Sequence, residues 1–237
     1  MKPLIRSFMM LLRQISKDSM LYAAIMAPLL AGVAFHFGVP WAESALCTYF
    51  NKPEILPRFY LLFDLFLAVI TPYIFCFASS MVMLTEYDEN IAAYMAVTPV
   101  GKRGYILSRL VLPAVISIFV SFMLMRFFAL SQWEPVRMLL TCVLTAILSL
   151  AVSLLLVSFS HNRVEGMAIA KLAGIIMLGL PVPFFIFSNV QYVFSLLPSF
   201  WIAKVSTESN NLFALPAVLS GFLWLWILYG RFEKKLS

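Results

Sequence analysis

The chain has 237 residues, of which 62% are hydrophobic and only 12% are charged, and its formal net charge at pH 7 is +6. Soluble domains carry roughly 25% charged residues, so this composition excludes a soluble protein and predicts an integral membrane protein. No polar stretch is long enough for a second, soluble domain, and residues 1–237 are expected to form a single membrane domain. The basic excess is typical of the flanks of membrane spans and does not indicate a nucleic-acid-binding protein.

The first 18 residues are amphipathic. Apolar residues recur at helical spacing from Leu4 to Ile15, whereas Arg6, Arg13 and Lys17 lie off that stripe. This pattern predicts a helix over residues 1–18 that lies in the membrane interface. The alternative is the charged region of a signal peptide, but this basic region is too long and too amphipathic for one.

Apolar runs predict an all-α, polytopic membrane protein with six transmembrane helices. The spans are expected at about 19–42, 59–84, 105–130, 136–160, 172–187 and 209–230, with a polar loop over 43–58. From Leu172 to Ala203 the 32 residues carry no formal charge, and as one helix they would be about 48 Å long against a hydrocarbon core of about 30 Å. Three prolines in this stretch predict a break, with an extracytoplasmic re-entrant or interfacial segment over residues 188–208.

The distribution of basic residues predicts the orientation. Six spans place both termini on one side of the membrane, together with the loops 85–104 and 161–166. Of the 17 Lys and Arg residues, 12 fall on that side and 5 on the other, which identifies it as the cytoplasmic side. We expect a multi-pass protein of the plasma membrane with both termini in the cytoplasm.

Residues 85–104 form a polar cytoplasmic loop between two apolar runs. Thr85 and Asp88 are spaced approximately as an N-terminal capping box, and Pro99 ends the helix that they would begin. One face of that short helix would carry Ile91, Tyr94, Met95 and Thr98. Such a helix is suited to docking on a soluble partner, and the alternative is a solvated or membrane-lying loop.

The sequence carries no catalytic or metal-binding motif. A phosphate-binding loop needs G-x-x-x-x-G-K-[ST], but around Gly101 and Lys102 the first glycine position is Ala96 and the hydroxyl position is Arg103. The two histidines and three cysteines show no metal-ligand spacing. We therefore expect no enzymatic activity, no bound cofactor and no metal in this chain.

Two charged residues lie inside apolar runs. Asp64 is in the outer part of the second predicted span, and Arg126 is in the outer part of the third. A charge in the bilayer costs about 2.5 to 3.5 kcal/mol or more at the centre, so each needs a partner or a wet cavity. The similar depth of the two predicts an ion pair, with a role in the substrate path as the alternative.

Together these features resemble the membrane permease subunits of the type-2 ATP-binding-cassette exporters. The resemblance rests on the order of four features: the amphipathic N-terminal helix, the acidic helix followed by residues 96–100, the loop 162–166 with Lys171, and the segment 198–204. It implies six spans per subunit and a dimer of this chain with a second copy or a paralogue. It also implies a separate ATPase subunit that holds ATP and magnesium.

In such permeases the loop between spans two and three forms a coupling helix that docks on the ATPase. The resemblance assigns this role to Glu86, Asp88, Glu89, Tyr94, Met95, Thr98 and Pro99. The second cytoplasmic loop would contribute Arg163, Glu165, Gly166 and Lys171. The substrate would be an apolar or amphipathic compound, such as a drug, an antibiotic or a peptide-like molecule.

Two other functions are weighed against this one. An ion-coupled secondary carrier would need titratable groups near the middle of the membrane, whereas Asp64 is predicted to be outer and Lys171 inner. An intramembrane enzyme would need a catalytic constellation that the sequence lacks.

Overall fold

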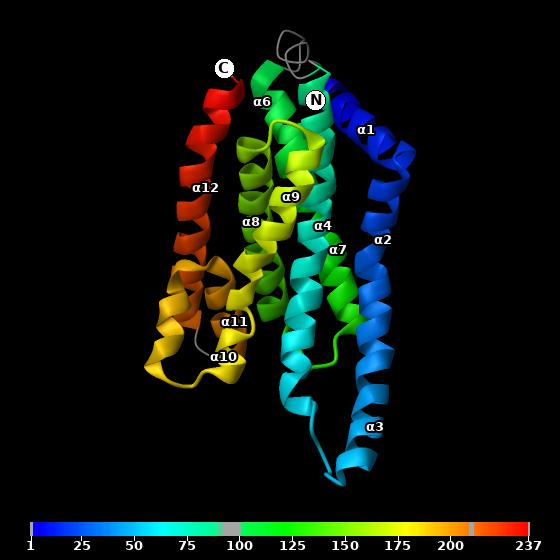
Figure 1. The fold of residues 1–237 in the computed structure, drawn as a ribbon, viewed down its shortest axis with the longest axis vertical. Helices are drawn as coiled ribbons and strands as arrows, with labels where there is room; N and C mark the ends of the chain where they lie inside the picture. The colour runs from blue at the N-terminus through cyan, green and yellow to red at the C-terminus, as the bar shows by residue number, and fades with distance from the viewer. Residues whose placement is uncertain (1, 90, 92–100, 209–210, 237) are drawn as a thin grey trace.

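The computed structural model describes residues 2–89, 91, 101–208 and 211–236, and these residues form helices joined by short connections (Figure 1). No strand occurs among them. The predicted all-α membrane fold is confirmed.

Five helical stretches in the described part of the chain are long and apolar enough to cross a membrane. They comprise Ser19–Phe50, Pro57–Asp88, Gly101–Phe128, Pro135–Phe159 and Ala214–Glu233. Their main helices are α2 (Ser19–Val33) with α3 (Val39–Phe50), α4 (Tyr60–Asp88), α6 (Gly101–Ile106) with α7 (Leu112–Phe128), α8 (Pro135–Phe159) and α12 (Ala214–Leu236).

The first stretch is longer than predicted. A π-helical turn, Ala34–Gly38, joins α2 to α3 without a break, and the helix ends only at Asn51, which has a left-handed φ of 53°. The predicted polar loop over 43–58 is therefore wrong in its first part, because Glu43 lies inside α3. Its carboxylate accepts the backbone N–H groups of Ile55 and Leu56 at 2.8 and 2.7 Å, which folds the loop back onto the helix.

The helices α4 and α8 pack against each other at the centre of the bundle. The hydroxyls of Ser80 and Ser153 lie 2.5 Å apart across this contact, and Ser149 on α8 is also fully buried. Small side chains let helix backbones approach closely in a membrane, where helices gain little from burying apolar surface. The buried serines therefore lie where α4 and α8 approach each other most directly at the centre of the bundle.

The predicted fifth span is a series of short helices and not one continuous helix. It consists of α9 (Arg163–Ala173), a 3₁₀ segment (Gly174–Gly179) and α10 (Val182–Phe185), followed by a second 3₁₀ segment (Asn189–Leu196) and α11 (Pro198–Thr207). Pro183 lies in the first turn of α10, and Pro198 begins α11. The predicted break at the prolines is present, and the sixth span remains a proposal.

Lys204 holds the segment over 188–208 together. Its side chain is buried, its Nζ lies 4.8 Å from the ring centroid of Tyr192, and it forms an ion pair with Glu208 at 2.9 Å. It also donates to the amide oxygen of Gln191 at 3.2 Å. These contacts join α11 to the preceding 3₁₀ segment.

The amphipathic N-terminal helix is present as α1 (Lys2–Lys17), which meets α2 at an angle near the end of the bundle (Figure 1). Leu11 and Ile15 are buried against the bundle, whereas Ile5 and Leu12 are exposed. Figure 1 also shows the two ends of the described chain near the start of α6, at the end of the bundle opposite the α7–α8 connection.

The predicted ion pair between Asp64 and Arg126 is wrong. Asp64 is buried and accepts the N–H groups of Leu130 at 2.8 Å, Ser131 at 2.9 Å and the Trp133 indole at 2.9 Å. Arg126 is exposed, and it forms no ion pair or hydrogen bond with any residue that the structure describes. Asp64 therefore fastens the α7–α8 connection to α4 and needs no cation.

We expect the substitution Asp64→Asn to lower the free energy of unfolding by about 2 kcal/mol, because three N–H donors lose a charged acceptor. The melting temperature of the purified chain in detergent would fall by about 4 to 8 °C. The substitution Arg126→Gln should change the free energy of unfolding by less than about 0.5 kcal/mol. If the two substitutions lowered the free energy of unfolding equally, and the double variant lost no more than either, Asp64 and Arg126 would form an ion pair after all.

Candidate coupling site at the end of α4

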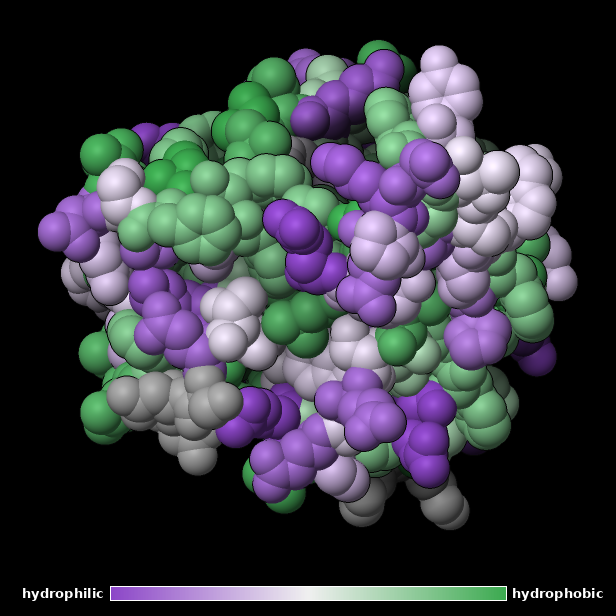
Figure 2. Space-filling model, turned by 90° about the horizontal axis from the view of Figure 1, so that it is seen from below, coloured by the Kyte–Doolittle hydropathy of each residue, from purple (hydrophilic) through white to green (hydrophobic). Residues whose placement is uncertain are grey.

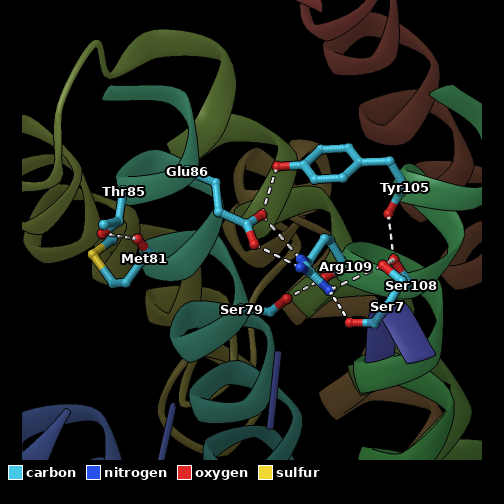
Figure 3. A network of polar contacts seen from close by, with 8 residues as sticks. All are labelled: Ser7, Ser79, Met81, Thr85, Glu86, Tyr105, Ser108 and Arg109. Carbon is cyan, nitrogen blue, oxygen red and sulfur yellow. Dashed lines mark hydrogen bonds and ion pairs between the residues drawn. The ribbon is translucent and has the colours of Figure 1, made fainter. Parts of the chain in front are cut away.

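A buried ion pair joins the end of α4 to the start of the third long helix, which is the stretch Gly101–Phe128 that contains α6 and α7 (Figure 3). Arg109 Nη2 lies 2.6 Å from Glu86 Oε1, and Arg109 Nε donates to Glu86 Oε2 at 3.0 Å. The two side chains are only 1% and 2% exposed. This two-point geometry matches the planar guanidinium to the carboxylate, and it gives each buried group a partner.

Three further side chains complete the network. Arg109 Nη1 donates to the backbone carbonyl of Ser7 on α1 at 2.6 Å, and the hydroxyls of Ser7 and Ser108 lie 2.9 Å apart. The Tyr105 hydroxyl donates to Glu86 Oε2 at 3.0 Å. Figure 3 shows these groups converging from three segments of the chain, so the network ties α1, α4 and the third long helix together.

Helical spacing explains how the sequence brings these groups to one place. Tyr105 and Arg109 are four residues apart and lie on one face, where α6 passes into the π-helical turn Leu107–Val111. On α4, Ser79 lies two turns before Glu86, and its hydroxyl donates to the backbone carbonyl of Arg109. Both helices therefore contribute a polar face at the same level.

The structure corrects two predictions for this region. Glu86 was predicted to contact an ATPase, but its side chain is buried in the ion pair and is not available to a soluble partner. The predicted capping box is also wrong, because α4 continues through Thr85 to Asp88 and the Thr85 hydroxyl donates to the carbonyl of Met81. Inside a helix the backbone N–H groups are already paired, so the Thr85 hydroxyl bonds to the carbonyl of Met81 instead of being a cap for an N–H group.

The other predicted coupling residues fall into two groups. Asp88 and Glu89 are exposed at the end of α4. Tyr94, Met95, Thr98 and Pro99 lie outside the described residues, as does most of the predicted short helix. The described part of the loop therefore places two carboxylates on the surface, immediately after the buried pair.

Asn162 caps the start of α9 in the predicted second cytoplasmic loop, and Glu165 reaches back to the residue before the cap. Asn162 Oδ1 accepts the N–H of Glu165 at 2.9 Å, and the Glu165 carboxylate accepts the N–H of His161 at 2.7 Å. The second of these bonds holds the pKa of Glu165 below its ordinary value. Lys171 is exposed further along the helix. The loop is thus an ordered helix start with charged residues at its surface.

Arg163 and Gly166 join this loop to the rest of the site. Arg163 Nη1 lies 2.5 Å from Oδ2 of Asp18, which also caps α2 by accepting the N–H of Met20 at 3.0 Å. The hydrogen bond from Arg163 holds the pKa of Asp18 below its ordinary value. Gly166 faces the Leu84 side chain so closely that a Cβ would collide with it. The starts of α2 and α9 therefore meet the last turns of α4.

A cavity of 350 Å³ lies where these elements meet. Its lining includes Gln14 of α1, Asp18, Arg163, Thr85 and Glu89. The predicted first and second cytoplasmic loops thus share one surface. Among the described residues, no group of three or more histidine, cysteine or carboxylate side chains could hold a metal ion.

The sequence indicates Glu86 and Arg163 as site residues, but it does not indicate their partners. Arg109 was counted only as a basic residue on the cytoplasmic side, and Tyr105, Ser7 and Asp18 were given no role. The signal that could have found Arg109 is its position inside an apolar run, four residues after a tyrosine.

We expect Glu86→Gln to lower the free energy of unfolding by about 3 to 5 kcal/mol, because it leaves the Arg109 guanidinium buried without a counter-charge. The double variant Glu86→Gln/Arg109→Met should lose less than the sum of the two single variants, as measured by unfolding in detergent. Glu89→Gln is the matched control, since the loss of this exposed carboxylate should change the free energy of unfolding by less than about 0.5 kcal/mol. Additive losses would show that the two side chains do not stabilise each other.

Comparisons with known proteins place this architecture in a family. A sequence model described as "Fluoroquinolones export permease protein Rv2686c-like" matches residues 11–230. Two relatives from Mycobacterium tuberculosis, the fluoroquinolones export permease proteins Rv2686c of strain ATCC 25618 / H37Rv and MT2760 of strain CDC 1551 / Oshkosh, are each 27% identical over 164 residues. The alignment covers 66% of this chain and 65% of each relative, so the chain spans about two thirds of their length. No solved structure matches it. The chain belongs to the Rv2686c-like family of fluoroquinolones export permease proteins.

Proposed function

We propose that this chain is the membrane-spanning subunit of an ATP-driven exporter and that a separate ATPase docks on its loop 85–104. The observation that carries the proposal is the buried pair between Glu86 and Arg109, which fastens both ends of that loop to each other. A loop with joined ends can move the two helices that it connects as one body. That property is needed to convert closure of a soluble subunit into movement of membrane helices.

The network extends this movement to the N-terminal helix. Arg109 binds the backbone of Ser7, so α1 is attached to the same point as α4 and the third long helix. Packed helices respond to force by shifting between discrete arrangements, because their interiors are too dense to deform gradually. Pressure on the loop would therefore shift α1, α4 and the start of the third helix together.

The proposed ATPase contacts are the exposed residues around this loop. Asp88 and Glu89 lie directly after the buried pair. The loop would add Tyr94, Met95, Thr98 and Pro99, and the second surface would add Glu165, Lys171 and the half-buried Arg163. Gly166 is buried against Leu84 and is not available to a soluble partner. ATP and magnesium would stay on the ATPase, and this chain would bind no cofactor and catalyse no reaction itself.

The substrate is proposed to be an amphipathic aromatic drug. The relatives are named as fluoroquinolones export permease proteins. A fluoroquinolone is a flat aromatic ring system that carries a carboxylic acid. We further propose that the segment from α9 to α10 completes six spans, that both termini are cytoplasmic, and that two permease subunits form the path. The second subunit is a copy of this chain or a paralogue.

The buried carboxylates of α4 argue against an ion-coupled carrier. Asp64 and Glu86 are 22 residues apart in sequence, which on one helix is about 33 Å and close to the thickness of a hydrocarbon core. Each lies near one end of α4, and each is fully occupied by donors. The described part of α4 thus has no free carboxylate near mid-membrane to carry a coupling ion.

The test is uptake of norfloxacin into inside-out vesicles that contain this chain and its ATPase. Uptake should require ATP on the outer, formerly cytoplasmic, face and should continue after a proton uncoupler is added. The double variant Tyr94→Glu/Met95→Glu should lose ATP-driven uptake and drug-stimulated hydrolysis, because it buries charge in the docking contact.

The matched control is Tyr94→Phe/Met95→Leu, which keeps the apolar character of both positions and should keep transport. Full ATP-driven uptake by the charged variant would show that this loop does not dock on the ATPase. Loss of uptake with the uncoupler at constant ATP would replace the exporter with a carrier.

A further inference from the structure

A second cavity lies at the opposite end of the molecule, between the end of α7 and the start of α8. Its volume is 410 Å³, within the range of sites that hold drug-sized ligands. The lining combines apolar and aromatic side chains (Phe122, Met125, Trp133 and Met138) with Arg126 and Gln132. Figure 2 shows the molecule from this end, where hydrophilic and hydrophobic side chains alternate over the surface.

Much of the apolar wall of this cavity is packed into the protein core. Met125 and Met138 are buried and belong to a core cluster with Ala68 and Cys142. The Trp133 indole is held in place because its N–H donates to Asp64 at 2.9 Å. A wall that is fixed before a ligand arrives costs little entropy on binding.

The polar part of the cavity contains a cation that has no partner among the described residues. Arg126 is exposed, and among the described residues it forms no ion pair or hydrogen bond. Asp64, which holds the Trp133 indole beside the cavity, is already occupied by three N–H groups. The exposed carboxylate of Glu134 lies 3.8 Å from Arg137, which is its own ion-pair partner. The described part of the chain therefore offers no anion to this guanidinium beside an aromatic wall.

We propose that this cavity binds the carboxylate of a flat aromatic acid. The carboxylate would form a two-point contact with the Arg126 guanidinium, and the ring system would lie against Trp133 and Phe122. This proposal rests on the proposed function and deepens it, because it names the part of the drug that is recognised. The cavity lies at the end opposite the coupling site, where an exported drug leaves the protein.

The experiment measures binding of norfloxacin, and of its methyl ester, to the full chain in lipid nanodiscs by equilibrium dialysis. The substitution Arg126→Gln should weaken binding of the acid about 10-fold to 100-fold, because a charge-assisted contact is lost. Binding of the ester should be equal in the two proteins. Arg126→Lys should retain part of the affinity for the acid.

The matched control is Arg137→Gln, which removes a neighbouring cation that does not line the cavity. It should leave binding of the acid unchanged. Equal binding of norfloxacin to the wild-type and Arg126→Gln proteins would overturn the proposal, as would an equal loss for the acid and the ester. Absence of binding to the wild-type chain would overturn it as well.

The vesicle assay separates this proposal from the proposed function. ATP-driven uptake by the wild-type protein, together with unchanged binding by Arg126→Gln, would reject the site and keep the exporter. Arg126-dependent binding without any ATP-driven uptake would keep the site and reject the exporter.

Discussion

The ion pair between Glu86 and Arg109 is the constraint on which the rest of this structure depends. Two charges are buried at the place where α4 ends and the third long helix begins, and each satisfies the other at 2.6 Å. Removing a buried charge from its partner is costly, so the two helix ends cannot separate without breaking a strong interaction. The ion pair therefore holds the two ends of the loop together, and the hydrogen bond from Arg109 to Ser7 attaches α1 to the same place.

A second carboxylate gives α4 a fixed point at its other end. Asp64 collects three N–H groups from the α7–α8 connection, and in doing so it orients Trp133 beside the cavity that contains Arg126. The central helix therefore contacts the proposed coupling surface with its last turns and the proposed drug site with its first. A rigid helix of this kind can relate the two surfaces, since a shift of one end moves the other.

The sequence predicted the fold class, the amphipathic α1 and the break at the prolines, because these depend on composition, periodicity and proline geometry along the chain. The family resemblance also predicted a permease of an export family, and a family model of fluoroquinolones export permease proteins matches residues 11–230. The partners of Asp64 and Glu86 were not predicted. The spans are apolar on every side, so their pattern gives the depth of a charge but not the direction in which it faces. The donors to Asp64 include backbone N–H groups, which every sequence offers equally. The Thr85–Asp88 pattern suits a helix start, but packing of α4 against the third helix carries the helix through it.

The most direct test of the account is to lock the two ends of the loop together. Cysteines replace Glu86 and Arg109 in a chain whose native cysteines are changed to serine, and a short reducible cross-linker joins them. We predict that the linked permease, with its ATPase in inside-out vesicles, still drives norfloxacin uptake with ATP, because the two ends move as one body. Uptake that stops when the link is formed and returns when it is reduced would show that the ends must separate, and would contradict this account.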